Sequence, residues 1–189
     1  MAAATSDLES LERRLRRLED RVEIHELIAR YGLVMDDRNM ADMPGLFTPD
    51  VAIRSGDGVM NTVGLEAVVA MFRGRFTVLG PSNHISHDKI ITFDEQDPDR
   101  ATGMVLSHAE MHRRGQPMIT AIRYQDAYRR EGGRWRFSER VLRFFYYVPT
   151  AQYLDALGPG LALRNRAYDN PVAADWPENL PTWKQYYGV

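Results

Sequence analysis

Four segments in the second half of the chain alternate apolar and polar side chains with a period of two, and this pattern limits the fold more than any other feature. The segments cover residues 84–93, 101–113, 118–130 and 135–147, and short turns rich in Asp, Gly and Pro separate them. Consecutive strands joined by such turns pair antiparallel. The pattern therefore predicts a strongly bent antiparallel meander with one face turned to a core.

Helical segments precede these strands. Ser6 and Glu9 fit an S-x-x-E capping box, and helical spacing without proline continues from there to about residue 37. A short helical turn at 40–47, a strand at 51–54 and a helix at 64–72 follow. This order predicts an α+β fold, a cone-shaped barrel of bent, mixed but mostly antiparallel sheet with N-terminal helices packed on its concave face. Such a cone can hold a small apolar ligand.

We divide the chain into three parts: a helical extension at 1–20, the cone domain at 21–147 and a C-terminal extension at 148–189. The C-terminal extension combines prolines with aromatic residues, so we expect it to pack on the domain or on a neighbouring subunit rather than to be disordered. The helical extension carries an apolar stripe among charged residues. Because such a stripe is costly to leave in water, it predicts a homodimer or homotrimer contact, and the alternative is a solvated arm. The stripe consists of Leu8, Leu11, Leu15, Leu18 and Val22.

The bulk composition excludes several classes of partner. The chain has 24 Lys and Arg against 26 Asp and Glu, so we expect no nucleic acid partner and no anionic membrane surface. It has no cysteine and no apolar run that could span a bilayer, and the first residues lack a signal-peptide core, which predicts a cytoplasmic protein. His84 and His87 fall on opposite faces of one predicted strand, so we expect no metal. No glycine-rich phosphate loop occurs in the sequence, so we expect no cofactor.

A histidine at the start of a strand and a carboxylate at the end of the long helix are the most reactive combination in the sequence. They are His84 and Asp36. A carboxylate that accepts a hydrogen bond from one imidazole nitrogen leaves the other nitrogen basic, and these two groups are the minimum needed to remove a proton from carbon. The alternative is a buried structural pair without chemistry.

Several short motifs occur in a characteristic order, namely Tyr31-x4-Asp36, Leu46-Phe47-x2-Asp50-Val51, Asn83-His84-x6-Ile91, Tyr124-x-Asp126 and Gly133-x-Trp135-x-Phe137. Their order and spacing resemble the nuclear transport factor two-like (cystatin-like) superfamily, and within it the SnoaL-like branch. The resemblance covers roughly residues 20–147. This superfold hosts enzymes, non-catalytic subunits and binding modules, so the fold alone does not imply a function.

The resemblance to the enzymes of this branch implies a cofactor-independent lyase or isomerase of the dehydratase or cyclase type. Its substrate would be a hydrophobic oxygenated molecule such as a polyketide, a steroid or an aromatic intermediate. His84 would accept or donate the proton, Asp36 would be its partner, and Tyr31 would polarise a substrate oxygen. The alternatives are an assembly subunit resembling the β subunit of ring-hydroxylating dioxygenases, or a small-molecule-binding module.

Side-chain alternation along the strands predicts further residues that contact the substrate. Tyr124 falls on a face that could line the pocket, and counting from an inward Phe137 turns Arg143 inward and Arg140 outward. A single β-bulge reverses that choice. Ile53 and Met111 lie where the resemblance to scytalone dehydratase implies a tyrosine and a histidine. We therefore expect both to shape specificity, and we do not expect the scytalone reaction itself.

Overall fold

The computed structural model describes residues 2–158 and 163–189. Its six-stranded sheet has the order β2-β1-β6-β5-β4-β3. All neighbouring strands are antiparallel except β1 and β6, which run parallel. The predicted α+β fold with a mixed, mostly antiparallel sheet is confirmed, whereas the short strand β2 was not predicted. The strands are β1 (Phe47–Ser55), β2 (Asn61–Val63), β3 (Leu79–Phe93), β4 (Arg100–Arg113), β5 (Gln116–Glu131) and β6 (Arg134–Pro149).

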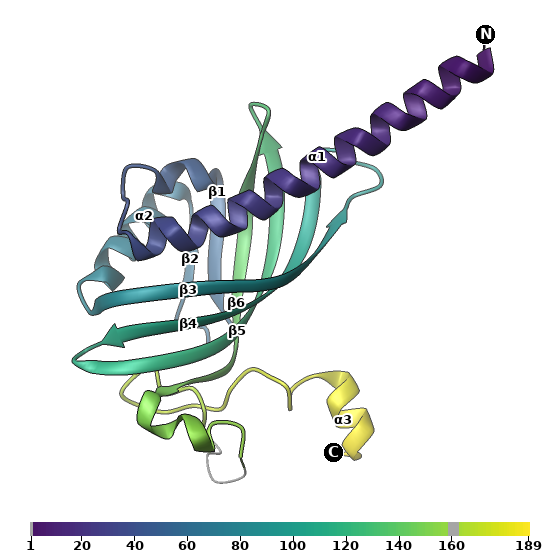
Figure 1. Cartoon of the computed structure of the whole chain (residues 1–189). Helices are drawn as coiled ribbons and strands as arrows, with labels where there is room; N and C mark the ends of the chain where they lie inside the picture. The colour runs from purple at the N-terminus through teal and green to yellow at the C-terminus, as the bar shows by residue number, and fades with distance from the viewer. Residues whose placement is uncertain (1, 159–162) are drawn as a thin grey trace.

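The sheet curls because its four long strands carry irregularities in register. The β3–β4 ladder shifts between Ser86 and Lys89, and the β5–β6 ladder shifts after Ala121 and again after Ala127. Each bulge bends its strand and adds right-handed twist. In Figure 1 the long strands sweep around an open concave side without closing into a barrel.

The first helix, α1 (Ala2–Asp36), crosses the concave side of the sheet. It begins at Ala2, ahead of the predicted start at Ser6. In its second half Ile24, Ile28 and Met35 are buried against the core. Its first half projects beyond the sheet (Figure 1), and the stripe from Leu8 to Val22 stays 57–61% exposed there.

A second helix closes another side of the cone. A 3-10 turn η1 (Met43–Leu46) leads into β1, and α2 (Leu65–Phe76) follows β2. From α2, Val68 and Phe72 are buried, and Phe72 stacks on Phe47 with ring centroids 6.3 Å apart. Together α1, α2 and the sheet enclose the apolar core from three sides.

The C-terminal segment follows a 3-10 turn η2 (Thr150–Asp155) and ends in the short helix α3 (Pro181–Tyr187). The Tyr147 N–H donates to the Arg164 carbonyl at 2.8 Å, and the Arg166 N–H donates to the Tyr147 carbonyl at 2.7 Å. Arg113 of β4 donates from Nε to the Ala167 carbonyl at 2.7 Å. These bonds tie residues 164–167 to the end of the sheet, below which the segment runs in Figure 1.

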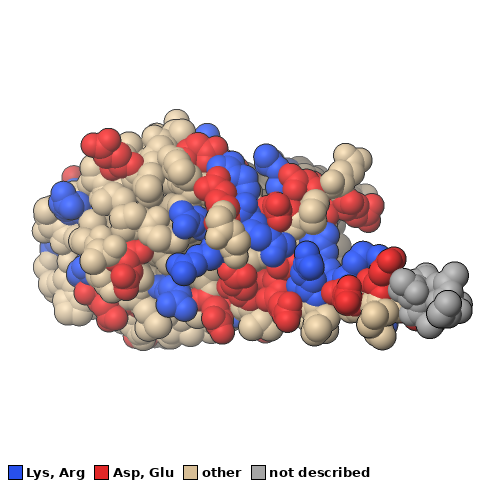
Figure 2. Space-filling view, turned by 90° about the horizontal axis from the view of Figure 1, so that it is seen from above, with Lys and Arg blue, Asp and Glu red and all other residues tan. Residues whose placement is uncertain are grey.

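The surface over α1 carries charges of both signs. Figure 2 shows lysines and arginines intermingled with acidic residues along the helix and the adjoining sheet, with no extended region of one sign on this face. A mixed surface of this kind does not create the directed field that attracts polyanions. Among the residues described, no helix is long and apolar enough to cross a membrane.

Candidate active site

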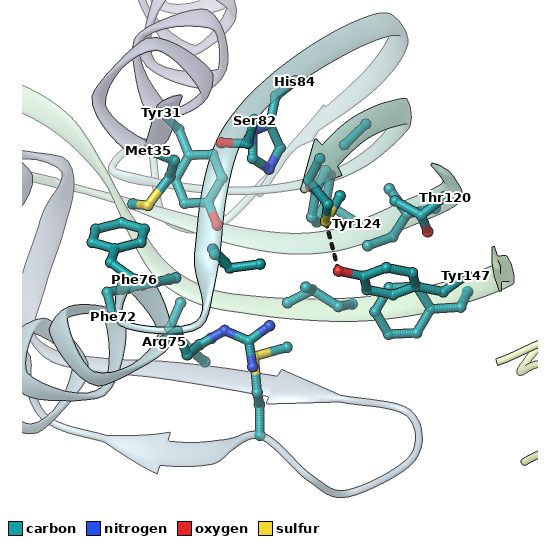
Figure 3. Close-up of a pocket in the computed structure, with 18 of the residues that line it drawn as sticks. Tyr31, Met35, Phe72, Arg75, Phe76, Ser82, His84, Thr120, Tyr124 and Tyr147 are labelled. Atoms are coloured by element: carbon teal, nitrogen blue, oxygen red, sulfur yellow. Dashed lines mark hydrogen bonds between the residues drawn. The ribbon is translucent and has the colours of Figure 1, made fainter. Parts of the chain in front are cut away.

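A cavity opens between α1, α2 and the concave face of the sheet (Figure 3). The volume inside it that the centre of a water molecule can reach is about 80 Å³, so the cavity is narrow. Its wall is mostly aliphatic and aromatic, as in ligand sites generally, and no Asp or Glu of the described residues lines it. The lining residues are Tyr31, Met35, Arg38, Ile53, Met60, Phe72, Arg75, Phe76, Leu79, Ser82, His84, Ala109, Met111, Thr120, Ile122, Tyr124, Leu142, Phe144 and Tyr147.

The structure brings His84 and Asp36 together at the edge of this cavity. His84 Nδ1 lies 2.6 Å from Asp36 Oδ1, and the His84 backbone N–H donates to Asp36 Oδ2 at 2.7 Å. The side chains of Asp36 and His84 are only 15% and 20% exposed. In Figure 3 the His84 ring points into the cavity. Since Asp36 engages Nδ1, the nitrogen left for a ligand is Nε2.

The end of α1 presents Asp36 to His84. The Asn39 N–H donates to the Val34 carbonyl at 3.0 Å and the Arg38 N–H to the Met35 carbonyl at 3.4 Å, which is the hydrogen-bond pattern of a Schellman motif. Arg38 takes the left-handed conformation that this motif needs, with φ of 57°, although a side chain makes it unfavourable. The helix thus stops directly after Asp36, and the carboxylate turns toward β3.

Ser82 and Arg38 hold the acid in place. Ser82 Oγ donates to Asp36 Oδ1 at 2.7 Å, and Arg38 Nη1 donates to Ser82 Oγ at 3.0 Å. Arg38 also donates to the carbonyls of Met35 and Gly80, and its guanidinium lies 4.3 Å from the centre of the Phe76 ring. The orientation of the dyad is therefore fixed by residues from β3, from α2 and from the turn that follows α1.

These contacts determine whether Asp36 is ionised. Burial raises the pKa of Asp36, but the hydrogen bonds and the charge of His84, together with the Ser82 hydroxyl, outweigh burial and leave the pKa below its ordinary value. Asp36 is therefore a carboxylate at neutral pH. As an acceptor it favours a proton on His84 Nδ1, which leaves a lone pair on Nε2 facing the cavity.

Tyr31 lies beside the histidine, with ring centroids 6.4 Å apart. It is buried in the core and also lines the cavity. Burial raises the pKa of Tyr31, and the nearby guanidinium of Arg140 only partly opposes this. The hydroxyl consequently keeps its proton across the whole physiological range and can act as a hydrogen-bond donor.

The expectation that Arg143 faces the pocket and Arg140 faces away is wrong. Arg140 is fully buried, and its guanidinium lies 4.1–4.2 Å from the ring centres of Tyr31, Tyr124 and Phe137. Arg143 does not line the cavity but lies 3.6 Å from Asp175. The cause is a bulge: Phe137 pairs with Tyr128 and Glu139 with Ala127, so Ser138 is extra and the alternation reverses beyond it.

Arg140 is held by Asp126 in a bidentate ion pair, with Nε–Oδ1 at 2.8 Å and Nη2–Oδ2 at 2.7 Å. Burial lowers the pKa of Arg140, but the charge and hydrogen bonds of Asp126 more than offset this and raise it overall. Arg140 is therefore charged beneath the cavity floor. Neither residue lines the cavity, so the pair supports Tyr31 and Tyr124 from behind.

The other residues expected to contact the substrate lie as follows. Ile53, Met111 and Tyr124 all line the cavity. The Tyr147 hydroxyl lies 2.6 Å from the Met111 sulfur (Figure 3), so it contacts this flexible side chain directly. Among the described residues, no group of three or more His, Asp or Glu side chains is arranged to hold a metal ion.

Sequence reasoning missed five polar residues of the site, namely Arg38, Arg75, Ser82, Thr120 and Tyr147. Ser82 had a detectable signal, since it lies two residues before His84 on the same strand and thus on the same face. Arg75 had one too, because it follows Phe72 at the i, i+3 spacing of a shared helix face. Arg38 had none, since its position depends on the left-handed turn that ends α1.

Comparison with solved structures shows the same architecture in other proteins. LinA superposes with a TM-score of 0.68 at 20% identity over 73% of this chain and 94% of that chain. The hexachlorocyclohexane dehydrochlorinase LinA-type3 from Novosphingobium barchaimii gives a TM-score of 0.65 at 20% identity, with 73% and 94% covered. An NTF2-like protein with a cystatin-like fold from Novosphingobium aromaticivorans gives 0.57 at 28% identity, with 71% and 88% covered.

Of two comparisons made with the sequence itself, one agrees with this architecture. A comparison with curated protein sequences found no significant match. Residues 16–141, however, match the SnoaL-like domain, and this range includes Asp36, His84 and all six strands except the end of β6. The chain therefore belongs to the SnoaL-like family.

Proposed function

We propose that this protein is a lyase or isomerase that transfers a proton at a carbon atom of a small, largely apolar substrate. The observation that carries the proposal is the His84–Asp36 pair, because its remaining imidazole nitrogen faces a cavity whose wall is mostly aliphatic and aromatic. A histidine that served only the core would not need a free nitrogen in a ligand-sized space. The name of the similar dehydrochlorinase, an elimination enzyme, supports the same class of reaction.

The geometry supports the following sequence of steps. Neutral His84 takes a proton from carbon at Nε2, and the electron pair of the broken C–H bond moves into the substrate to form an enolate on an adjacent carbonyl. Tyr31 donates a hydrogen bond to the enolate oxygen. Asp36 stabilises the imidazolium that results. The proton then returns from Nε2, either to a leaving hydroxyl, which departs as water, or to another carbon.

Deuterium exchange tests the proposal without knowledge of the natural substrate. The probe is 3-oxocyclohexane-1-carboxylate in D2O, whose protons beside the ketone exchange through an enolate and are followed by NMR. We expect the wild-type protein to accelerate exchange and the His84→Ala variant to lose most of the acceleration while it remains folded. General base catalysis by one positioned group is typically worth about 10² to 10⁴ in rate.

A second histidine on the same strand provides a matched control. His87 Nε2 lies 2.8 Å from His108 Nδ1 on the outer face of the sheet, away from the cavity, so His87→Ala should exchange the probe at the wild-type rate. Exchange that is equally fast in wild type and His84→Ala would contradict the proposal. Binding of the probe with no accelerated exchange would instead identify a small-molecule-binding module.

A further inference from the structure

Two arginines line the cavity, and they are held very differently. Arg38 is engaged by Ser82, by three backbone carbonyls and by the Phe76 ring. Arg75, near the end of α2, forms no ion pair with any residue of the described chain. In Figure 3 its guanidinium extends into the cavity, across from His84 and beyond the Tyr31 hydroxyl.

The surroundings of Arg75 leave its charge uncompensated. It is half-buried, its neighbours on the helix face are Phe72 and Phe76, and the cavity wall contains no carboxylate. Placing a cation among apolar side chains is unfavourable unless an anion or hydrogen-bond acceptors pair with it. The positive charge is felt across the cavity, since it opposes the burial that raises the pKa of both Tyr31 and Tyr147.

A guanidinium in this position suits one ligand group better than others. Its planar fork of N–H donors matches the two oxygens of a carboxylate, and such charge-assisted pairs are about twice as strong as neutral hydrogen bonds. A carboxylate bound there would leave the rest of a small molecule between Arg75 and His84. The acidic carbon would then face Nε2 at the other end of the cavity.

We propose that Arg75 is the carboxylate-binding residue of this site and that the substrates are small carboxylic acids. The inference deepens the proposed function by naming the substrate class. Arg75 acts here in binding and orientation, whereas His84 and Asp36 supply the proton transfer.

The test compares two molecules of one shape that differ in charge. Benzoate and benzamide are titrated into the wild-type protein by isothermal calorimetry, and 3-oxocyclohexane-1-carboxylate is compared with its carboxamide in the same way. We expect each carboxylate to bind about tenfold to hundredfold more tightly than its amide, the range expected for one charge-assisted pair. Equal affinity, including no detectable binding of either molecule, would overturn the inference.

Variants of α2 assign the preference to one side chain. Arg75→Gln should remove the preference for the carboxylate, and Arg75→Lys should retain part of it because the charge remains while the planar fork is lost. Arg73, two residues earlier, is exposed on the outer side of the same helix. Arg73→Gln therefore changes the net charge equally, and it should bind both molecules as the wild type does. An undiminished preference in folded Arg75→Gln would refute the assignment.

The two proposals fail in different ways. If His84→Ala still prefers benzoate but no protein form accelerates deuterium exchange, the carboxylate site stands and the proposed chemistry falls. If exchange depends on His84 while benzoate and benzamide bind alike, the chemistry stands and the carboxylate site falls.

Discussion

Arg140 and Asp126 form a bidentate ion pair inside the core, with side chains only 1% and 0% exposed. The Tyr128 hydroxyl adds a hydrogen bond to Asp126 Oδ2 at 2.8 Å, and three aromatic rings surround the guanidinium. The pair lies under the cavity and shares Tyr31 with it. The core and the candidate site are thus built on the same aromatic side chains.

Removing one member of this pair should strongly destabilise the protein. Asp126→Asn leaves the buried guanidinium without its counter-charge, and we expect the free energy of unfolding to fall by about 3 to 5 kcal/mol. Urea denaturation measures this free energy of unfolding. The exposed pair Arg54–Glu139 is the control, since Glu139→Gln should cost less than about 1 kcal/mol. Similar losses of unfolding free energy in both variants would show that the buried pair contributes no more to stability than the exposed pair.

The stability of the protein should depend on pH through Asp36. Its pKa is lower in the folded state than the ordinary value of about 4, so the folded state binds this proton less readily than the unfolded state. The resulting stabilisation is fully present above that ordinary value and is lost as the pH falls through the lower folded value. Denaturation of wild type and Asp36→Asn between neutral and acidic pH should converge in acid. Parallel curves would contradict this.

The hydroxyl of Tyr31 should matter for the reaction and little for the fold. Tyr31→Phe keeps the ring on Arg140 but removes the donor that stabilises the enolate, and we expect the exchange rate of the ketone probe to fall about 10² to 10³-fold. Tyr128→Phe also removes a buried hydroxyl but one that lies outside the cavity lining. It should lower stability and leave the rate unchanged. A Tyr31→Phe enzyme with the wild-type rate would remove Tyr31 from the mechanism.

The stripe on the first half of α1 should mediate self-association. Five apolar side chains that are 57–61% exposed on one helix face favour contact with a second copy of the helix. We expect Leu11→Asp combined with Leu15→Asp to reduce the molecular mass in solution, measured by light scattering after gel filtration. Arg13→Asp, on the opposite face, should leave the mass unchanged. A wild-type protein that is monomeric at micromolar concentrations would disprove this role of the stripe.

The sequence was sufficient for the four long strands, because period-two alternation is a local property, but not for the short strand β2. It also identified His84 and Asp36 as a pair through the family resemblance. It failed at Arg140 and Arg143, since the extra residue Ser138 in β6 reverses the alternation and leaves no mark in the sequence pattern. It overlooked Arg75 because the predicted helix at 64–72 ended before that residue, whereas α2 runs to Phe76.

The left-handed turn at Arg38 links the stability of one helix end to the integrity of the His84–Asp36 pair. Asp36 occupies the last position of α1, and its carboxylate joins this end of the helix to β3 through hydrogen bonds with Ser82 and His84. Opening of this turn would separate the carboxylate from His84 while the sheet persists, because local openings cost less free energy than global unfolding. Under the proposed function, these hydrogen bonds hold the helix end and the catalytic geometry together, so a variant that weakens the turn should lose activity at a lower temperature than the one at which it melts.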